Sequence, residues 1–142
     1  MWGENMKRLA VFLLAMACVL MLVGCTPNVG NVKNVRVGDY HSDIYTDAEI
    51  ESAIGTAINY FQKQFDGCTL TEITYIGDAE LENWKEFAER RHADEVIVLV
   101  SSFDVDASGG DGSLNPNSTY TNRKWILVRN QNGNWTHADH GY

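Results

Sequence analysis

The chain has 142 residues, of which 11 are Lys or Arg and 19 are Asp or Glu, so its formal net charge is −8 at neutral pH. This length suits one domain with a modest hydrophobic core. An acidic surface repels phosphate backbones, so the composition argues against a nucleic-acid partner. No motif in the sequence indicates a cofactor, and none is expected.

The first 24 residues have the pattern of a leader that is removed on export. Lys7 and Arg8 form a positively charged start, and an apolar run follows from residue 9 to residue 23. Such a start, an apolar centre and small residues before a cut site are typical of a secretory signal. The run is shorter than the roughly 20 residues of a spanning helix, so we expect cleavage and not permanent insertion.

The leader ends in Leu22-Val23-Gly24-Cys25, which resembles a bacterial lipobox. The resemblance implies that a signal peptidase recognises Leu22, Val23 and Gly24 and that the thiol of Cys25 carries a diacylglyceryl group. Two acyl chains are enough for stable anchoring, where one chain is marginal. We therefore expect a lipoprotein on the extracytoplasmic face of the cell membrane, held by lipid on Cys25. The alternatives are an uncleaved anchor and an ordinary secretory signal.

Cleavage would leave 118 residues with 9 basic and 18 acidic side chains. Because Cys25 is lipidated, Cys68 would be the one free cysteine, and no intrachain disulfide could form. We expect Cys68 to be a small buried apolar residue and not a nucleophile.

Residues 25–39 contain Pro, Gly and Asn with scattered Val, which predicts a flexible tether. The alternation of Val35 and Val37 is compatible with a short strand, but we assign the whole segment to the tether. A single domain is expected from residue 40 to residue 142.

The first element of the domain is a long amphipathic helix after Thr46. Thr46 as N-cap and Glu49 three residues later form a capping box. Gly67 is expected to end the helix. Apolar side chains recur at spacings of three and four and predict one buried stripe, formed by Ile50, Ile54, Ala57, Ile58, Phe61 and Phe65.

Two strands with a helix between them follow. Residues 69–76 are rich in β-branched side chains and predict the first strand. Asp78 is placed to cap the second helix, with Leu81 and Trp84 on its inner side. Residues 95–105 are apolar on both alternating faces, which is typical of a central strand that is covered on both sides.

The chain ends in a predicted hairpin. Residues 130–134 form its turn, with Gly133 available for positive φ, between strands 124–129 and 135–142. The predicted order is therefore helix, strand, helix, strand, strand, strand.

This order resembles the nuclear-transport-factor-2-like superfold, in which a strongly curved sheet wraps a long helix into a cone. More specific likenesses connect the chain to an uncharacterised group of Gram-positive lipoproteins that bear a domain of unknown function. They lie in Asp43-Ile44-Tyr45-Thr46, Gly67-Cys68-Thr69-Leu70, and the Trp125…Trp135…Gly141-Tyr142 ending. The resemblance implies an α+β, cystatin-like cone with a mainly antiparallel sheet. It implies no activity, because the superfold hosts isomerases, dehydratases and binding modules.

Residues 104–112 begin like a calcium-binding loop, with oxygen-bearing side chains at alternate positions and Gly109 at the sixth. The twelfth position is Asn115, where such loops carry a bidentate Glu. We prefer a long hairpin connection without a metal. The alternative is a calcium site formed by Asp104, Asp106, Ser108 and Asp111.

The segment His137-Ala-Asp139-His140 is a candidate for general-base chemistry near neutral pH. On a regular strand His137 and His140 point to opposite faces and cannot chelate one metal. Whether Trp125 lies opposite His140 or Asp139 depends on the turn length, so the inward face stays open. The alternative catalytic set is Asp139 or His140 as base, with Tyr75 or Tyr142 as proton donor.

The domain is also rich in aromatic side chains, which we interpret first as core. If the cone is partly open, the same rings would line an apolar pocket. The lining residues would then be Tyr60, Trp84, Phe103 and Trp125.

The leading functional hypothesis is a non-catalytic binding or interaction module on a lipid anchor, for an unknown protein or a small apolar ligand. The alternative is a cone enzyme of isomerase, dehydratase or hydrolase type, and the third is a calcium-stabilised module. Two copies could also pair through the open face of residues 96–105, unless the second helix covers it.

Overall fold

A computed structural model describes residues 29–142 of the protein. Leu22, Val23, Gly24 and Cys25, on which the leader and the anchor were predicted, lie outside the described residues. Within residues 29–142, no helix is long and apolar enough to cross a membrane. The elements are β1 (Arg36–Val37), α2 (Asp47–Gln64), β2 (Cys68–Tyr75), α3 (Asp78–Leu81), the 3₁₀ turn η1 (Glu82–Trp84), α4 (Lys85–Arg90), β3 (Glu95–Val105), β4 (Thr119–Arg129) and β5 (Thr136–Gly141).

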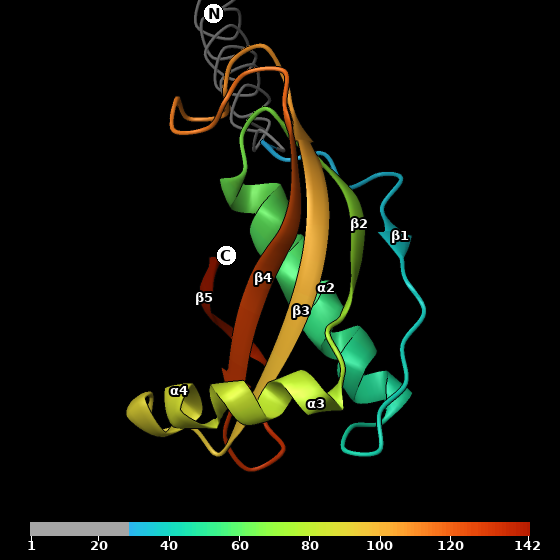
Figure 1. The fold of residues 1–142 in the computed structure, drawn as a ribbon, viewed down its shortest axis with the longest axis vertical. Coiled ribbons are helices and arrows are strands. Elements are labelled where there is room, and N and C mark those ends of the chain that lie inside the picture. Colours follow the sequence, from blue (N-terminus) through green and yellow to red (C-terminus); the bar gives the residue numbers. More distant parts are fainter. Residues whose placement is uncertain (1–28) are drawn as a thin grey trace, which may run out of the picture.

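The strands form one sheet in the order β1-β2-β3-β4-β5. β1 is parallel to β2, and all other neighbours are antiparallel. The long helix α2 packs along one face, while α3, η1 and α4 cross one end of the other face (Figure 1). The predicted α+β architecture, with a long first helix on a mainly antiparallel sheet, is therefore confirmed.

Helix α2 begins at the capping box that the sequence predicts. The Glu49 side chain accepts a hydrogen bond from the Thr46 amide at 2.8 Å, and the Thr46 hydroxyl oxygen accepts one from the Glu49 amide at 3.3 Å. The helix ends at Phe65, two residues before Gly67, whose φ of +65° turns the chain into β2. The buried stripe consists of Ile50, Ala53, Ile54, Ala57 and Phe61, and each large side chain in it contributes roughly 1.5–3 kcal/mol.

Residues 29–39 differ from the predicted tether, because they pack on the domain. The Gly30 amide donates to the carbonyl of Gln62 at 3.0 Å, and the Gly38 amide donates to the carbonyl of Ile73 at 3.0 Å. Between these bonds, β1 pairs with the edge of β2. Composition predicted a tether because Gly and Asn favour turns, but the open edge of β2 supplies backbone partners that composition does not reveal. The folded part therefore includes residues 29–39.

The second helical segment is broken into α3, η1 and α4, and Asp78 does not cap it. The N-cap position is Gly77, while the Asp78 carboxylate accepts hydrogen bonds from the Ser42 hydroxyl at 2.6 Å and the Tyr75 hydroxyl at 2.7 Å. It also accepts from the amide of Asp43 at 2.7 Å. Asp78 therefore fixes the segment before α2 to the end of β2.

The broken helix covers one end of the outer face of the sheet. Leu81 of α3 and Ala88 of α4 are buried, and beneath the helices Val96 and Val98 of β3 are 5% and 0% exposed. The second helical segment therefore covers this end of the strand, and pairing of two copies through the rest of the face stays a prediction.

At the amino-terminal end of α2, a buried arginine joins the helix to the sheet. The guanidinium of Arg129 pairs with Glu49 of α2 at 2.5 Å and with Glu95 of β3 at 2.6 Å. It also lies 4.2 Å from the ring centroid of Trp135 and 5.7 Å from that of Tyr45. The Arg129 side chain is 6% exposed, and its hydrogen bond lowers the pKa of Glu49.

Candidate functional site

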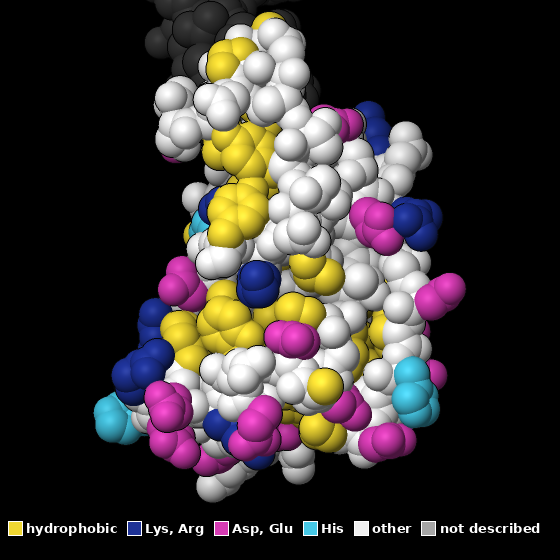
Figure 2. Space-filling view, in the orientation of Figure 1, with side chains coloured by type: hydrophobic (Ala, Val, Ile, Leu, Met, Phe, Trp, Pro, Cys, Tyr) yellow, Lys and Arg dark blue, Asp and Glu magenta, His cyan; other side chains and the backbone are white. Residues whose placement is uncertain are grey.

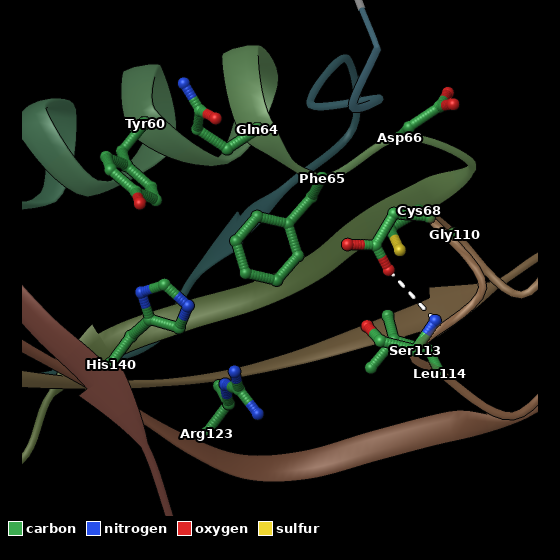
Figure 3. A pocket seen from close by; sticks show the side chains of 11 residues that line it. Tyr60, Gln64, Phe65, Asp66, Cys68, Gly110, Ser113, Leu114, Arg123 and His140 are labelled. Carbon is green, nitrogen blue, oxygen red and sulfur yellow. Dashed lines mark hydrogen bonds between the residues drawn. The ribbon is translucent and has the colours of Figure 1, made fainter.

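A cleft of about 220 Å³ lies at the carboxyl-terminal end of α2. It opens between this helix, the sheet side formed by β4 and β5, and the connection from β3 to β4. Figure 3 shows Arg123 and His140 on the sheet side, facing Tyr60 and Phe65 on the helix side. The remaining wall includes Gln64, Asp66, Cys68, Gly110, Asp111, Ser113 and Leu114.

A β-bulge in β5 determines which side chains reach this cleft. Asp139 pairs with Ile126 and His137 with Leu127, so Ala138 has no partner in β4. As a result His137 and His140 lie on the same face, with His137 Nε2 at 2.9 Å from His140 Nδ1. The prediction of opposite faces was wrong, because it assumed a regular strand. The sequence left the register of the terminal hairpin open, and the structure places Trp125 opposite His140.

Aromatic rings surround the two histidines. Tyr60 stacks on His137 with 3.8 Å between ring centroids, and His140 lies 5.2 Å from Trp125 and 5.4 Å from Phe65. Burial lowers the pKa of both histidines, and the positive charge of Arg123 adds to the effect on His140. In a neutral pair, one ring nitrogen donates the shared hydrogen bond and the other accepts it. If His140 Nδ1 accepts, its Nε2 carries a hydrogen on the side of the ring turned away from His137.

Arg123 is the cation of the cleft, and sequence reasoning missed it. Its Nε atom is buried without a hydrogen-bond partner, the one such side-chain atom among the described residues. No ion pair within residues 29–142 includes Arg123, and its guanidinium lies 5.2 Å over the ring of Tyr142. A buried donor without an acceptor costs about 1–3 kcal/mol. The available signal was the spacing, since Arg123 lies two residues before the buried Trp125 and shares its face of the strand.

The predicted catalytic residues do not come together. The carboxylate of Asp139 is exposed and accepts a hydrogen bond from the amide of His140, the next residue. Tyr75 donates its hydroxyl to Asp78, and burial raises its pKa. Tyr75 of β2 and His140 of β5 lie at opposite ends of a row of paired residues that crosses four strands. At the usual strand spacing their backbones are about 14 Å apart. Tyr142 is 66% exposed.

The predicted apolar pocket inside the domain is filled with aromatic rings. Phe103 and Trp125 are both 0% exposed, and the Trp125 indole donates to the Ser101 hydroxyl at 2.8 Å. Trp84 lies elsewhere, against Phe87 of α4. Of the four proposed lining residues, Tyr60 alone lines the cleft described above, so core packing is the role of Phe103 and Trp125.

The proposed calcium ligands are engaged in separate local hydrogen bonds. Asp104 accepts from the Thr119 hydroxyl, Asp106 from the amide of Ser108, and Asp111 from the amide of Ser113. Within residues 29–142, no group of three or more His, Cys, Asp or Glu side chains is placed to hold a metal ion. The segment is a long connection between β3 and β4, as preferred from the sequence.

Cys68 is 2% exposed, and burial raises the pKa of its thiol to about 11. The prediction of a small buried residue is confirmed. A thiol with this pKa stays protonated at neutral pH and is a poor nucleophile.

A second groove, of about 350 Å³, lies between the short helices and the start of β3. Its wall includes Leu81, Ala88 and Val96 together with Ile44, which is 57% exposed. Figure 2 shows apolar side chains between charged ones over the lower part of this face. The groove is an apolar surface, in contrast to the cleft beside Arg123.

The described residues thus define a single α+β domain with a polar cleft at one end of its long helix. Comparisons of the chain with protein-family models, with curated proteins and with solved structures find no match.

Proposed function

We propose that this chain is a lipid-anchored, extracytoplasmic binding module that presents the cleft beside Arg123 to a small ligand. The observation that carries the anchor is the Leu-Val-Gly-Cys sequence at residues 22–25 after an apolar run. The ligand role draws support from a cleft that contains an arginine without a carboxylate partner among the described residues. The residues of the calcium and cone-enzyme alternatives lie apart, which favours the binding module over both.

We further propose that the fold is a cone of the nuclear-transport-factor-2-like or cystatin-like kind. In support, α2 lies along one face of a sheet whose long strands β3 and β4 bend around it (Figure 1). Bulges interrupt the pairing of β2 with β3 and of β3 with β4, and bulges of this kind increase sheet curvature.

The folding of residues 29–39 shortens the proposed link to the membrane. Val29 accepts a hydrogen bond from the amide of Gly67, whose own carbonyl accepts from Asp106 at the start of the β3–β4 connection. Three residues lie between Cys25 and Val29, and the four steps along the chain reach at most about 14 Å. We therefore propose that the cleft end of the domain faces the bilayer, with the β4–β5 turn at the far end.

Replacing Cys25 with Ala tests the anchor. The variant should leave the membrane pellet for the soluble fraction while keeping the unfolding midpoint of the wild type. If C25A sedimented with membranes as the wild type does, the anchor would be refuted.

Fluorescence transfer to a dye in the bilayer tests the orientation. Labels on Ala107→Cys, in the β3–β4 connection, and Asn134→Cys, beside the β4–β5 turn, report the two ends of the domain. The long axis of α2 alone is about 27 Å, so transfer from position 107 should be clearly stronger. Equal transfer from both positions would contradict the proposed orientation. The buried thiol of Cys68 should not take the label.

A further inference from the structure

Two arginines on the same face of β4 have opposite surroundings. Arg123 and Arg129 are six residues apart, about 20 Å along the strand. Arg129 is paired with Glu49 and Glu95, whereas Arg123 has no carboxylate partner among the described residues. β4 therefore contains one arginine that carboxylates of the chain neutralise and one that no described carboxylate neutralises.

The surroundings of Arg123 suit a carboxylate. A guanidinium presents planar, paired donors that match the two oxygens of a carboxylate. His140 lines the same cleft, and its Nε2 can donate a second hydrogen bond when Nδ1 accepts from His137. The volume of about 220 Å³ is below the roughly 300 Å³ at which drug-sized pockets begin, so the occupant must be small.

The opposite wall of the cleft has the opposite charge. Asp111, in the β3–β4 connection, lines it, whereas the carboxylate of Asp66, just after α2, points away from the cleft in Figure 3. Asp111 is held by the amide of Ser113 at 2.9 Å, as the dashed line in Figure 3 marks. The Asp111 carboxylate, on a chain of net charge −8, disfavours a bare anion and favours a ligand that also carries a positive group.

We propose that the cleft binds a small zwitterion, with its carboxylate on Arg123 and its ammonium group beside Asp111. Tyr60 and Phe65 would contact the carbon chain between the two charges. This inference rests on the proposed binding function and names its ligand class.

The test compares three small molecules that share one carbon chain: 4-aminobutanoate, butanoate and butylamine. The lipidated protein, purified in detergent, is titrated with each while NMR follows the Nε–H signal of Arg123 and calorimetry measures the affinity. We expect 4-aminobutanoate to shift this signal and to bind about 10-fold or more tightly than either half-molecule, since each charged contact is lost in one of them.

Three variants test which residue of the protein contacts each charged group of the ligand. Arg123→Gln should weaken 4-aminobutanoate binding by about 10- to 100-fold, and Asp111→Asn should bring its affinity down towards that of butanoate. Arg90→Gln, an exposed arginine of α4, is the matched control and should bind as the wild type does. The unfolding midpoint of each variant shows that it is folded.

The proposal is overturned if the Arg123 signal does not move, if Arg123→Gln binds as well as the wild type, or if butanoate binds as tightly as 4-aminobutanoate. Such a failure is distinguishable from failure of the anchor, because membrane sedimentation of the protein before detergent extraction reads out Cys25 independently.

Discussion

The two ends of helix α2 are built on different principles, although β4 contributes an arginine to each. At the amino-terminal end Arg129 is enclosed by two carboxylates and two aromatic rings. At the carboxyl-terminal end Arg123 lies beside a cleft with its Nε unpartnered. The difference indicates that the first end holds the fold together, while the second is available for a ligand.

The largest expected effect is at the closed end. Arg129→Gln leaves Glu49 and Glu95, about one third exposed, without their cation, and it removes packing on Trp135. We expect the free energy of unfolding to fall by about 3 kcal/mol, at the lower end for a broken buried pair because water reaches both carboxylates. Urea unfolding followed by tryptophan fluorescence measures it. A loss below about 1 kcal/mol would show that Arg129 does not hold α2 to the sheet.

A smaller effect is expected at the turn that positions the cleft wall. Gly67 has φ of +65°, and a β-carbon there would lie 2.5 Å from the Ser108 hydroxyl and 2.7 Å from an Asp106 carboxylate oxygen. Gly67→Ala should therefore lower the free energy of unfolding by about 1–2 kcal/mol. Gly55→Ala, on the exposed side of α2 with nothing within 4 Å of the new carbon, is the control and should stabilise by about 0.5–1 kcal/mol. Equal effects of the two changes would contradict this view of the turn.

Acidification should lower the free energy of unfolding through the two histidines at the carboxyl-terminal end of α2. The folded-state pKa values of His137 and His140 lie below the ordinary 6.5, so the unfolded chain takes up protons first. Stability is then fully present above about pH 6.5 and falls as the pH decreases towards the folded-state values. Arg123 from β4, Arg91 after α4, Asp139 of β5 and Tyr60 of α2 are the groups that face the pair.

Unfolding curves between pH 7.5 and 5.5 measure the effect, with the double change of His137 and His140 to Gln as reference. The wild type should lose more stability than this variant over the interval. The same slope in both proteins would show that other groups cause the loss.

The smallest effect on stability is expected from Arg123→Gln. Since no described carboxylate depends on this arginine, the free energy of unfolding should change by no more than about 0.5 kcal/mol. The same unfolding experiment measures it, and a loss as large as that of Arg129→Gln would mean that Arg123 is a structural residue.

Local signals explain why part of this structure could be predicted from sequence. The capping box at Thr46 and the 3–4 spacing of apolar residues fix α2 through contacts within a few residues of each other. The alternation and length of residues 95–105 likewise predicted a central strand, which β3 is. The coarse α+β architecture follows from these elements.

The features that were missed depend on partners far away in the sequence. Residues 29–39 gain their order from the edge of β2, and the pairing of His137 with His140 depends on one unpaired residue, Ala138. The role of Arg123 as a site residue depends on the packing of β4, α2 and the β3–β4 connection against one another. Bulges and edge pairing leave little local signal, and the bulge in β5 is what brings His137 and His140 together beside the cleft.

One unfolding experiment tests the contrast between the two ends most directly. It compares the wild type, Arg129→Gln and Arg123→Gln, each with and without saturating 4-aminobutanoate. A ligand that binds only the folded state raises the free energy of unfolding by RT ln(1 + L/Kd), where L is the free ligand concentration. We predict that the zwitterion stabilises the wild type and Arg129→Gln by the same amount and stabilises Arg123→Gln by at least about 1.4 kcal/mol less, as a 10-fold or greater loss of affinity requires. Equal stabilisation of all three proteins, or of none, would contradict the assignment of Arg123 to a ligand.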